Sequence, residues 1–526
     1  MAFIARMKNM PKETFYITSP LYYVNDVPHI GSAYTTIACD AVARYKRLRG
    51  FDVCFLTGTD EHGQKIFKAA NEKGMTPQAH CDFIALKFQE LWELLDIKYD
   101  KFSRTTSKNH EVIVQEFFNR VYKNGDIYEA NYEGLYCEPC EDFKAVKDLL
   151  EGNICPVHKT KVQEYKEKNY FFALSKFQDR LSDYFDKNPD FIQPSYRKNE
   201  VLGWVKEGLK DFPISRQSVK WGIPLPVDTS QTIYVWFDAL IGYLSPLLND
   251  GDLVNLENAM KKYWPSSVHV IGKDILRFHA VYWPCMLMSA GYPLPKKVFG
   301  HGFLTKDGEK MGKSTGNIID PYELINEFGT DAVRFYFLKE VAFGKDGDFS
   351  RETFINRINS DLANNLGNLL NRSLNLVNKN FNGEIENTNS DLLSLKIKLE
   401  ETIKSYEKHI ENLDLKDALD VVWQLVDATN KAFNDNAPWK MIKAGNLNDA
   451  KSCLYETLEI LRNISILINP FIPSTSIKMY EQLGFDSFSL TSEWQCLGIG
   501  KKSQFFKVLE GKPIFPRVED KMQKTV

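Results

Sequence analysis

Residues 14–57 read TFYITSPLYYVNDVPHIGSAYTTIACDAVARYKRLRGFDVCFLT, and this stretch decides the fold. Its first six residues and the run VCFLT at 53–57 are rich in β-branched and aromatic side chains, as buried strands are. Between them, apolar residues recur every three or four positions from Ile30 to Leu48, which predicts a helix that ends before Gly50. A strand, a helix and a second strand form a βαβ unit, which implies a parallel sheet with a right-handed crossover.

The alternation of strands and helices then stops and later resumes. Residues 121–224 contain clustered cysteines, many charges and no clean βα repeat, which indicates an inserted domain. Strand-like runs at 267–272 and 297–305 continue the earlier pattern. We therefore expect residues 1–120 and 225–320 to form one sheet-based domain that the insertion splits.

The sequence changes character beyond residue 350. Long stretches with a 3.6-residue apolar period, such as 415–433, together with few β-branched runs, predict a helical bundle over residues 351–526. Residues 321–350 form a short connecting subdomain. The expected fold class is thus α/β, a Rossmann-type parallel sheet with an inserted domain, followed by an α-helical bundle.

The composition is that of a globular protein, with 43% hydrophobic and 26% charged residues. The formal charge of −3 excludes a protein held on nucleic acid by bulk charge alone. The most apolar run, residues 280–288, is far shorter than the ~18 residues that a membrane helix needs, and we recognise no secretory signal. Nine cysteines, too few for a disulfide framework, favour a reducing compartment, so we expect a cytoplasmic protein without membrane partners.

Two short turns carry a potential metal site. Cys137 and Cys140 form a CxxC motif, and Cys155 and His158 form a CxxH motif, with fourteen residues between the two motifs. Three thiolates and one imidazole at this spacing match a closed tetrahedral zinc site. Because four protein ligands leave no position for water, we expect one structural Zn²⁺ that stabilises the insertion.

Four expected strands run into polar or glycine-rich loops. Ligands of open α/β sheets bind outside the carboxyl ends of the strands, so we expect these loops to build one site. The loops are SPLYYVNDVPHIGS (19–32), GTDEHG (58–63), GKDILRFH (272–279) and GHGFLTKDGEKMGKS (300–314).

Two of these loops suit phosphate groups. Gly31 and Ser32 begin the first helix, whose N-terminus attracts anions, and His29 just before it can donate to a phosphate. Alone, His29 has an ordinary explanation as a capping or core histidine, and the KMGKS loop has one as a charged surface loop. Together they predict a fixed and a mobile cationic element that clamp a triphosphate from two sides. The mobile residues are Lys310, Lys313 and Ser314.

HIGS followed by KMGKS is similar to the HIGH and KMSKS signatures of class I aminoacyl-tRNA synthetases. Longer segments, in the same order and at similar separations, resemble the methionyl-tRNA synthetase family from about residue 14 to 350. These segments are PLYYVNDVPHIGSAYT, FLTGTDEHG, YVWFDALIGYL, IGKDILRFHAVYWP and GHGFLTKDGEKMGKSTGN. Position 32 is Ser where the signature has its second His, and position 312 is Gly where it has Ser. Ser32 can still donate to a phosphate.

The resemblance implies a reaction. ATP activates methionine to methionyl-adenylate and releases pyrophosphate, and the methionine then passes to the 3′-terminal adenosine of its tRNA, initiator or elongator, for translation. The implied catalytic residues are His29, Ser32, Lys310 and Lys313, with Mg²⁺ bound to ATP. Gly31, Gly272, Asp274 and Ser314 would join them in holding ATP. Charge neutralisation on the departing pyrophosphate would then be the main catalytic effect.

The resemblance also implies a methionine pocket and a zinc-stabilised insertion. Asp60 would pair with the α-ammonium, and aromatic walls suit the thioether sulfur. YVWFDALIGYL has an ordinary explanation too, as a buried strand and helix start. The residues that would line the pocket are Leu21, Tyr23, Trp236, Ala239, Tyr243, His279 and Trp283.

In the family that the chain resembles, the helical half binds the anticodon. Asn368 and Arg372 lie one helical turn apart and share a face, and Trp439 follows Pro438 at a helix break. Arginine and asparagine can read base edges, and an indole can stack on an unstacked base. The alternative is that the first two belong to a solvated face and Trp439 to the core. We expect a monomer.

Three other functions stay open at this point. A class I synthetase for another aliphatic amino acid usually has a bulkier insertion. A tRNA-binding regulatory protein that has lost catalysis would usually lose His29 or the lysines. A small-molecule nucleotidyltransferase with a similar fold does not explain the helical half.

Overall fold

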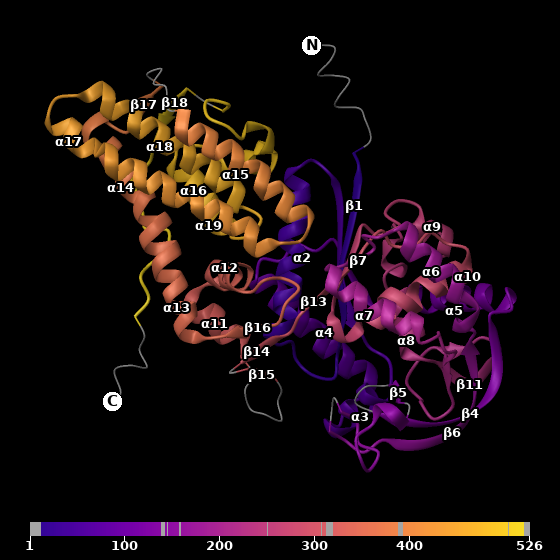
Figure 1. Ribbon diagram of the computed structural model, residues 1–526. Coiled ribbons are helices and arrows are strands. Elements are labelled where there is room, and N and C mark those ends of the chain that lie inside the picture. The colour runs from indigo at the N-terminus through magenta and orange to yellow at the C-terminus, as the bar shows by residue number, and fades with distance from the viewer. Residues whose placement is uncertain are drawn as a thin grey trace, which may run out of the picture.

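The computed structural model describes residues 12–137, 142–144, 146–156, 159–249, 251–306, 308–311, 319–387, 393–502 and 504–519. In Figure 1 a helical C-terminal half lies beside a sheet-based N-terminal half, with helix α2 (Ile30–Leu48) between them. The expected parallel sheet and helical C-terminal half are confirmed.

Among the described residues, six parallel strands form the central sheet in the order β3–β2–β1–β12–β13–β7. Because β1 lies between β2 and β12, the chain order reverses at the β1–β12 pair, and ligands bind beyond the carboxyl ends at such a point. The strand bounds are Thr14–Tyr23 (β1), Asp52–Asp60 (β2), Lys101–Arg104 (β3), Ile192–Gln193 (β7), Val268–Gly272 (β12) and Val298–His301 (β13).

Helix α2 makes the crossover from β1 to β2 and is buried over most of its length. Its apolar residues pack on the sheet, and its basic last turn, with Lys46 and Arg47, suits the negative end of the helix dipole. Other helices cover the sheet or extend its loops. Their bounds are Gln64–Glu72 (α3), Pro77–Leu94 (α4), Lys108–Lys123 (α5), Val235–Ile241 (α8), Leu256–Met260 (α9) and Trp283–Ala290 (α10).

The insertion has an antiparallel sheet of its own, in the order β5–β4–β6–β8. A smaller sheet, β10–β11–β9, follows it. Strand β7 lies inside the range 121–224 but pairs with β13, so this part of the chain returns to the central sheet before it continues. The bounds are Ile127–Cys137 (β4), Asp142–Lys144 (β5), Gln163–Phe172 (β6), Gln178–Lys187 (α6), Ser195–Lys206 (α7), Phe212–Pro213 (β8), Ser215–Arg216 (β9), Pro224–Leu225 (β10) and Asp228–Ile233 (β11).

A three-stranded sheet and two helices connect the halves. Its strands are Leu304–Lys306 (β14), Glu309–Lys310 (β15) and Gly347–Phe349 (β16), and its helices are Pro321–Phe328 (α11) and Thr330–Glu340 (α12).

The C-terminal half is a helical bundle around α18, which is buried from Cys453 to Ile468. A π-helical segment, Ile358–Gly367, joins α13 to α14. The bounds are Arg351–Arg357 (α13), Asn368–Phe381 (α14), Glu384–Glu386 (β17), Leu393–Glu411 (α15), Leu415–Asn436 (α16), Pro438–Lys443 (α17), Leu447–Ile468 (α18), Pro473–Gln482 (α19) and Phe505–Lys507 (β18).

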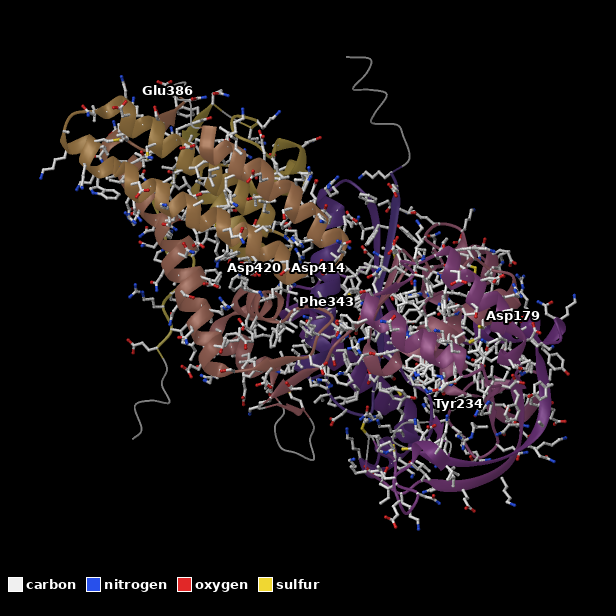
Figure 2. All side chains as sticks on the ribbon, viewed as in Figure 1. Asp179, Tyr234, Phe343, Glu386, Asp414 and Asp420 are labelled. Carbon is white, nitrogen blue, oxygen red and sulfur yellow. The ribbon has the colours of Figure 1, made fainter. Side chains whose placement is uncertain are left out.

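Ion pairs join the bundle to the rest of the molecule. Lys46 at the end of α2 binds Glu411 of α15 with an N–O distance of 2.6 Å. Lys339 of α12 donates to Asp420, which Figure 2 labels on the bundle. None of the helices that the structure describes combines the length and the apolar character needed to cross a membrane.

Candidate active site at the carboxyl ends of the strands

The start of α2 has the geometry of an anion site. His29 is the N-cap, and its Nδ1 accepts a hydrogen bond from the Gly31 amide at 3.0 Å. The neutral ring therefore carries its proton on Nε2, where it can donate. A Cβ on residue 31 would lie 2.8 Å from the His29 Cε1 atom, so only glycine lets the ring fold over the helix start. Ser32 follows in the first turn and is buried.

The end of β13 is tied to the same helix. The Thr35 hydroxyl lies 2.8 Å from Nε2 of His301, whose Nδ1 lies 2.7 Å from the Gly302 carbonyl. A carbonyl only accepts, so Nδ1 of His301 carries the proton and Nε2 accepts from Thr35. Burial lowers the pKa of His301, which keeps the ring neutral. His301 stands in the GHGF loop, and sequence reasoning gave it no role.

The second expected cationic element follows directly along the chain. Lys310 ends β15, which pairs with β14, and Thr305 is its partner in the register. Only its backbone is described. Lys313 and Ser314 lie outside the described residues, as does Gly312.

Gly272 and Asp274 lie at the carboxyl end of β12, next to β1 in the sheet. The Asp274 carboxylate lies over Gly272, where a Cβ would come within 2.6 Å of its Oδ1 atom. Lys273 between them binds Asp346 at 2.7 Å, and Asp346 also accepts from the Phe303 amide. The loops after β12 and β13 are therefore held together at the edge where α2 begins.

Asp60 ends β2 and is buried with an unsatisfied oxygen. Its Oδ1 has no hydrogen-bond partner within the described part of the chain. Burial, with the nearby charges of Asp238 and Glu61, raises the pKa of Asp60 well above the usual value of an aspartate. A buried carboxylate without a cation is costly, and a bound ammonium group would satisfy it.

The acids beside Asp60 are fully satisfied. Glu61 binds Arg104 through a 2.7 Å contact. Asp238, buried on α8, accepts from His62 at 2.7 Å and from His110 at 2.5 Å. Burial raises the pKa of Asp238, but the two imidazoles outweigh it and hold the value at about 2. Sequence reasoning missed this His–Asp–His network, because His62 and His110 lie 176 and 128 residues from Asp238 in the sequence. Only His62 stands in a motif that the sequence analysis named, GTDEHG.

The aromatic residues beyond Asp60 are positioned by hydrogen bonds. The Tyr243 hydroxyl lies 2.7 Å from Nε2 of His279, whose Nδ1 lies 2.9 Å from the Ile275 carbonyl. Burial lowers the pKa of His279 to about 4, so the ring is neutral, donates through Nδ1 and accepts from Tyr243. Tyr16 donates to the Tyr243 carbonyl at 2.6 Å.

The other residues expected in the pocket divide into two groups. Trp236 stacks on Phe278 with 3.7 Å between ring centroids, and Ala239 follows it one turn later on α8. Leu21 packs against Gly242, where a Cβ would lie 2.4 Å from its Cδ1 atom. Tyr23 ends β1 beneath the Lys65 ammonium, 5.5 Å from the ring centroid. Trp283 instead lies in the core, against the rings Phe117 and Trp264.

Two of the four residues expected to bind a metal lie within the described part of the chain. Cys137 and Cys155 are both buried and pack in one small cluster with Val162. Cys155 closes a tight turn, since its carbonyl accepts from the Lys159 amide at 2.8 Å. Cys140 and His158 lie outside the described residues. Two buried thiols brought together from separate turns suit a tetrahedral zinc site.

Arg372 and Trp439, two of the three residues expected to contact the anticodon, lie next to each other. The Arg372 guanidinium lies 5.2 Å from the Trp439 ring and 4.9 Å from Phe433, and it donates to Asn434 at 3.1 Å. Asn368 is exposed at the start of the same helix, α14. Sequence reasoning missed Phe433 and Asn434. They lie on α16, about sixty residues after Arg372 in the sequence.

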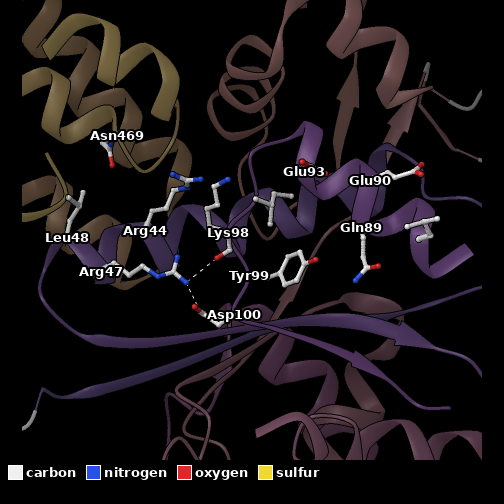
Figure 3. Close-up of a pocket in the computed structure, with 12 residues that line it drawn as sticks. Arg44, Arg47, Leu48, Gln89, Glu90, Glu93, Lys98, Tyr99, Asp100 and Asn469 are labelled. Carbon is white, nitrogen blue, oxygen red and sulfur yellow. Dashed lines mark hydrogen bonds and ion pairs between the residues drawn. The ribbon is translucent and has the colours of Figure 1, made fainter. Parts of the chain in front are cut away.

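A roomy pocket elsewhere contains none of these residues. Figure 3 shows this pocket of about 720 Å³, with Arg44 and Arg47 of α2 across from Gln89 and Glu93 of α4. Asp100, directly before β3, accepts from Arg47 there. The pocket thus lies at the amino ends of the strands, on the opposite edge from the candidate site, where ligands of such sheets do not usually bind.

Comparison with known families gives two matches that follow the two halves of the chain. Residues 15–164 and 144–374 match the family described as tRNA synthetases class I (M). Residues 383–524 match the anticodon binding domain of methionyl tRNA ligase.

Comparison with individual proteins gives matches over nearly the whole chain. The methionine–tRNA ligase of Nostoc sp. is 51% identical over 97% of this chain and 98% of its own length. The chloroplastic/mitochondrial methionine–tRNA ligase of Arabidopsis thaliana is 51% identical over 96% of this chain and 83% of its own. The structure of Mycobacterium tuberculosis methionyl-tRNA synthetase in complex with methionyl-adenylate has a TM-score of 0.90 at 39% identity, covering 96% of this chain and 100% of that one.

Asp60→Asn should make the ligand-free protein more stable at neutral pH, by roughly 1–3 kcal/mol, because it removes a buried charge without a cation. Because the pKa of Asp60 is raised in the folded state, this residue does not lower the free energy of unfolding at pH values below 3.8, the ordinary pKa of an aspartate. It lowers the free energy of unfolding increasingly as the pH rises above that value. Urea unfolding at pH 4 and pH 8 measures the difference. Asp183→Asn, exposed on α6, is the control. A less stable Asp60→Asn protein at pH 8 would mean that a cation already pairs with Asp60.

Proposed function

The chain belongs to the methionine–tRNA ligase family of class I aminoacyl-tRNA synthetases, and we propose that its reaction takes place at the carboxyl edge of the central sheet. The enzyme activates methionine with ATP to methionyl-adenylate and pyrophosphate, and then transfers the methionine to tRNA. The observation that carries the site is Asp60, a buried carboxylate with an unsatisfied oxygen two strands from β12 and next to the strand that leads to His29.

We propose the following roles in activation. His29, Gly31 and Ser32 hold the ATP phosphates at the start of α2, and Gly272 and Asp274 hold the nucleotide at the end of β12. An oxygen of the methionine carboxylate attacks the α-phosphorus, and the bond to the pyrophosphate oxygen breaks. The carboxylate is ionised at neutral pH, so this step needs no general base. Catalysis comes from positioning and from charge neutralisation.

Pyrophosphate is the group whose charge grows in this step. We propose that Lys310, Lys313 and Ser314 close over it from the side opposite His29. ATP use by class I synthetases implies Mg²⁺, which supplies further positive charge when it is bound with ATP. Gly312 gives the loop more conformational freedom than the serine of the signature.

We propose that Asp60 pairs with the methionine ammonium and that aromatic rings surround the thioether. Tyr243 and His279 are held in one orientation by hydrogen bonds, so they need no reordering when the ligand arrives. Leu21, Tyr23, Trp236 and Ala239 complete the pocket. Trp283, buried against Phe117 and Trp264, is the expected pocket residue that the proposal places on the core side of the pocket.

We propose one structural Zn²⁺ held by Cys137, Cys140, Cys155 and His158. The burial of Cys137 and Cys155 in one cluster supports it. Four ligands would exclude water, so the zinc stabilises the insertion and takes no part in catalysis.

We propose that Asn368, Arg372 and Trp439 contact the tRNA anticodon. The contact between Arg372 and Trp439 supports a shared surface on which a base can stack and have its edge read. The domain division that fits these roles is 1–120 with 225–320 for catalysis, 121–224 for the insertion, 321–350 for the connection and 351–526 for the anticodon. We also expect a monomer in the cytoplasm, and the free thiols of the described cysteines agree with a reducing compartment.

Exchange of labelled pyrophosphate into ATP, run with each of the twenty amino acids, tests the function. Methionine alone should give strong exchange. Lys313→Ala should lower it by about 10²–10³-fold, because a cation on the departing pyrophosphate is lost. Lys345→Ala, which removes an exposed lysine of the connecting region, should leave it unchanged.

Two results would contradict this assignment. Strong exchange with isoleucine would point to another amino acid. Loss of bound zinc together with exchange in Lys313→Ala would mean that Lys313 supports the fold rather than the reaction.

Cys140→Ser should reduce bound zinc from about one per chain to a small fraction, because one thiolate of four is lost. Metal analysis after gel filtration measures it, and limited proteolysis should then cut within residues 121–224 before the helical half. Cys496→Ser, outside the insertion, is the control. A full equivalent of zinc in Cys140→Ser would exclude this residue as a ligand.

Arg372→Ala and Trp439→Ala should each raise KM for tRNA at least fivefold, because stacking on one base is worth about 1–3 kcal/mol. Aminoacylation kinetics measure this, while methionine-dependent exchange should not change. Lys440→Ala, the exposed neighbour of Trp439, serves as the matched control. Wild-type KM in both variants would place anticodon recognition elsewhere.

A further inference from the structure

Asp238 is the centre of a buried network to which the proposed reaction gives no role. It is fully buried on α8, and each of its two oxygens accepts a hydrogen bond from an imidazole. Nδ1 of His62 lies 2.7 Å from one oxygen, and Nε2 of His110 lies 2.5 Å from the other. Since a carboxylate only accepts, both of these nitrogens carry protons. The other ring nitrogen of His110, Nδ1, lies 2.8 Å from the Ser245 hydroxyl oxygen.

Three members of this network lie close in the chain to residues of the proposed methionine pocket. A single residue separates the two members of each pair, and the pairs are His62 with Asp60, Asp238 with Trp236, and Ser245 with Tyr243. The pairs belong to three separate segments, which are the loop after β2, helix α8 and the turn that leads into the short helix Ser245–Leu247. Two residues span at most about 7 Å of chain, so a displaced network member displaces its pocket residue as well.

The loop that carries His62 is also held from another side. The Trp221 indole donates to the Glu61 carbonyl at 2.5 Å, and the Trp221 carbonyl accepts from the Gly63 amide at 3.0 Å. The His62 ring packs edge-on against the same indole, with 5.6 Å between the ring centroids. These contacts restrict the imidazole on both sides, so its hydrogen bond to Asp238 fixes α8 against this loop.

The network also distinguishes two neighbouring carboxylates. Burial raises the pKa of Asp60, the charges of Asp238 and Glu61 raise it further, and a hydrogen bond from the His62 amide lowers it. His62 therefore binds Asp60 through its backbone and Asp238 through its ring. Both oxygens of Asp238 are occupied, whereas Oδ1 of Asp60 has no partner among the described residues. An ammonium group that arrives here thus has Asp60 as its open partner.

We propose that Asp238, His62 and His110 are positioning residues that set the length of the amino acid accepted. They hold α8 at a fixed distance from the loop after β2, so the ammonium on Asp60 and the thioether between the aromatic rings have to fit at the same time. An amino acid that is longer by one methylene then loses part of one of these two contacts. The inference rests on the proposed function, to which it adds the residues that fix the two ends of the pocket.

The test measures pyrophosphate exchange by the full-length enzyme with methionine and with ethionine, whose side chain is longer by one methylene. Wild-type enzyme should prefer methionine at least about tenfold in kcat/KM, because one methylene in an apolar pocket is worth about 10–200-fold. His62→Ala should raise KM for methionine about tenfold and lower this preference at least about threefold, while KM for ATP stays within about twofold. His62→Asn keeps a donor near the position of Nδ1 and should recover most of the preference.

A purely structural role of the network would give a different result. Loss of folded enzyme lowers kcat for both amino acids by the same factor and leaves KM and the preference unchanged. Val121→Ala, buried farther along the helix that carries His110, is the matched control, and it should lower the thermal midpoint without changing the preference. Ser245→Ala removes a hydroxyl only, so it should fold even if His62→Ala does not, and it should lower the preference about twofold.

Two outcomes overturn the inference and leave the proposed function standing. The first is a wild-type preference for methionine in those variants of His62 and Ser245 that fold. The second is an equal loss of preference in Val121→Ala, since general destabilisation would then explain the effect. Absence of methionine-dependent exchange in wild-type enzyme would instead overturn the proposed function, and this inference with it.

Discussion

The buried ion pair between Asp40 and Arg334 holds the two halves of the molecule together. Asp40 lies on α2 and Arg334 on α12, both are fully buried, and their N–O distance is 2.7 Å. Both members of the pair have further partners: Asp40 also accepts from Arg44 and from the Lys98 amide, and Arg334 donates to carbonyls that include Phe471 of the bundle. Burial raises the pKa of Asp40, but the two guanidinium groups outweigh it and keep the value low. Breaking such a pair typically costs about 3–5 kcal/mol, so the geometry is strongly enforced.

Because this ion pair fixes α2, it also fixes the groups at both ends of that helix. The helix begins at His29, on the carboxyl edge of the sheet, and its last turns bind Glu411 and the bundle. A 19-residue helix is about 28 Å long and behaves as a stiff rod. The same helix therefore orients the proposed phosphate site and the helical half. Three neighbouring acids at the carboxyl edge of the sheet differ in their hydrogen bonding. Glu61 and Asp238 are paired with cationic or imidazole groups, while one oxygen of Asp60 has no partner among the described residues. Among the described residues, Asp60 is thus the acid of this edge with an oxygen left for another partner, which is what the proposed pairing with the methionine ammonium requires.

Local pattern was enough to predict the βαβ unit, the parallel sheet and the helical half, because strand and helix periodicity are properties of short windows. The resemblance supplied the residues expected in the pocket, and the structure places four of them, Leu21, Trp236, Tyr243 and His279, on neighbouring elements. Long-range pairing was beyond the sequence. A short window of sequence cannot show that His110 binds Asp238. Nor can it show that β7, inside the insertion, pairs with β13 of the central sheet. A tryptophan such as Trp283 fits the same apolar sequence pattern whether it lines a pocket or fills the core, so the pattern cannot distinguish the two positions.

The insertion resolves a geometric problem that the sheet alone cannot. A parallel sheet offers one crevice, where the order of its strands reverses, and two small substrates already fill it in the proposed reaction. A long RNA must approach from outside, with its charge neutralised near the adenylate. Strand β6 of the insertion pairs with β8, and the Ile214 carbonyl directly after β8 accepts from the amide of Tyr234, the N-cap of α8, so the insertion is joined to the helix that carries the proposed pocket residues Trp236 and Ala239. The proposed zinc would suit the insertion, because a small domain with few apolar residues has little core of its own to stabilise it.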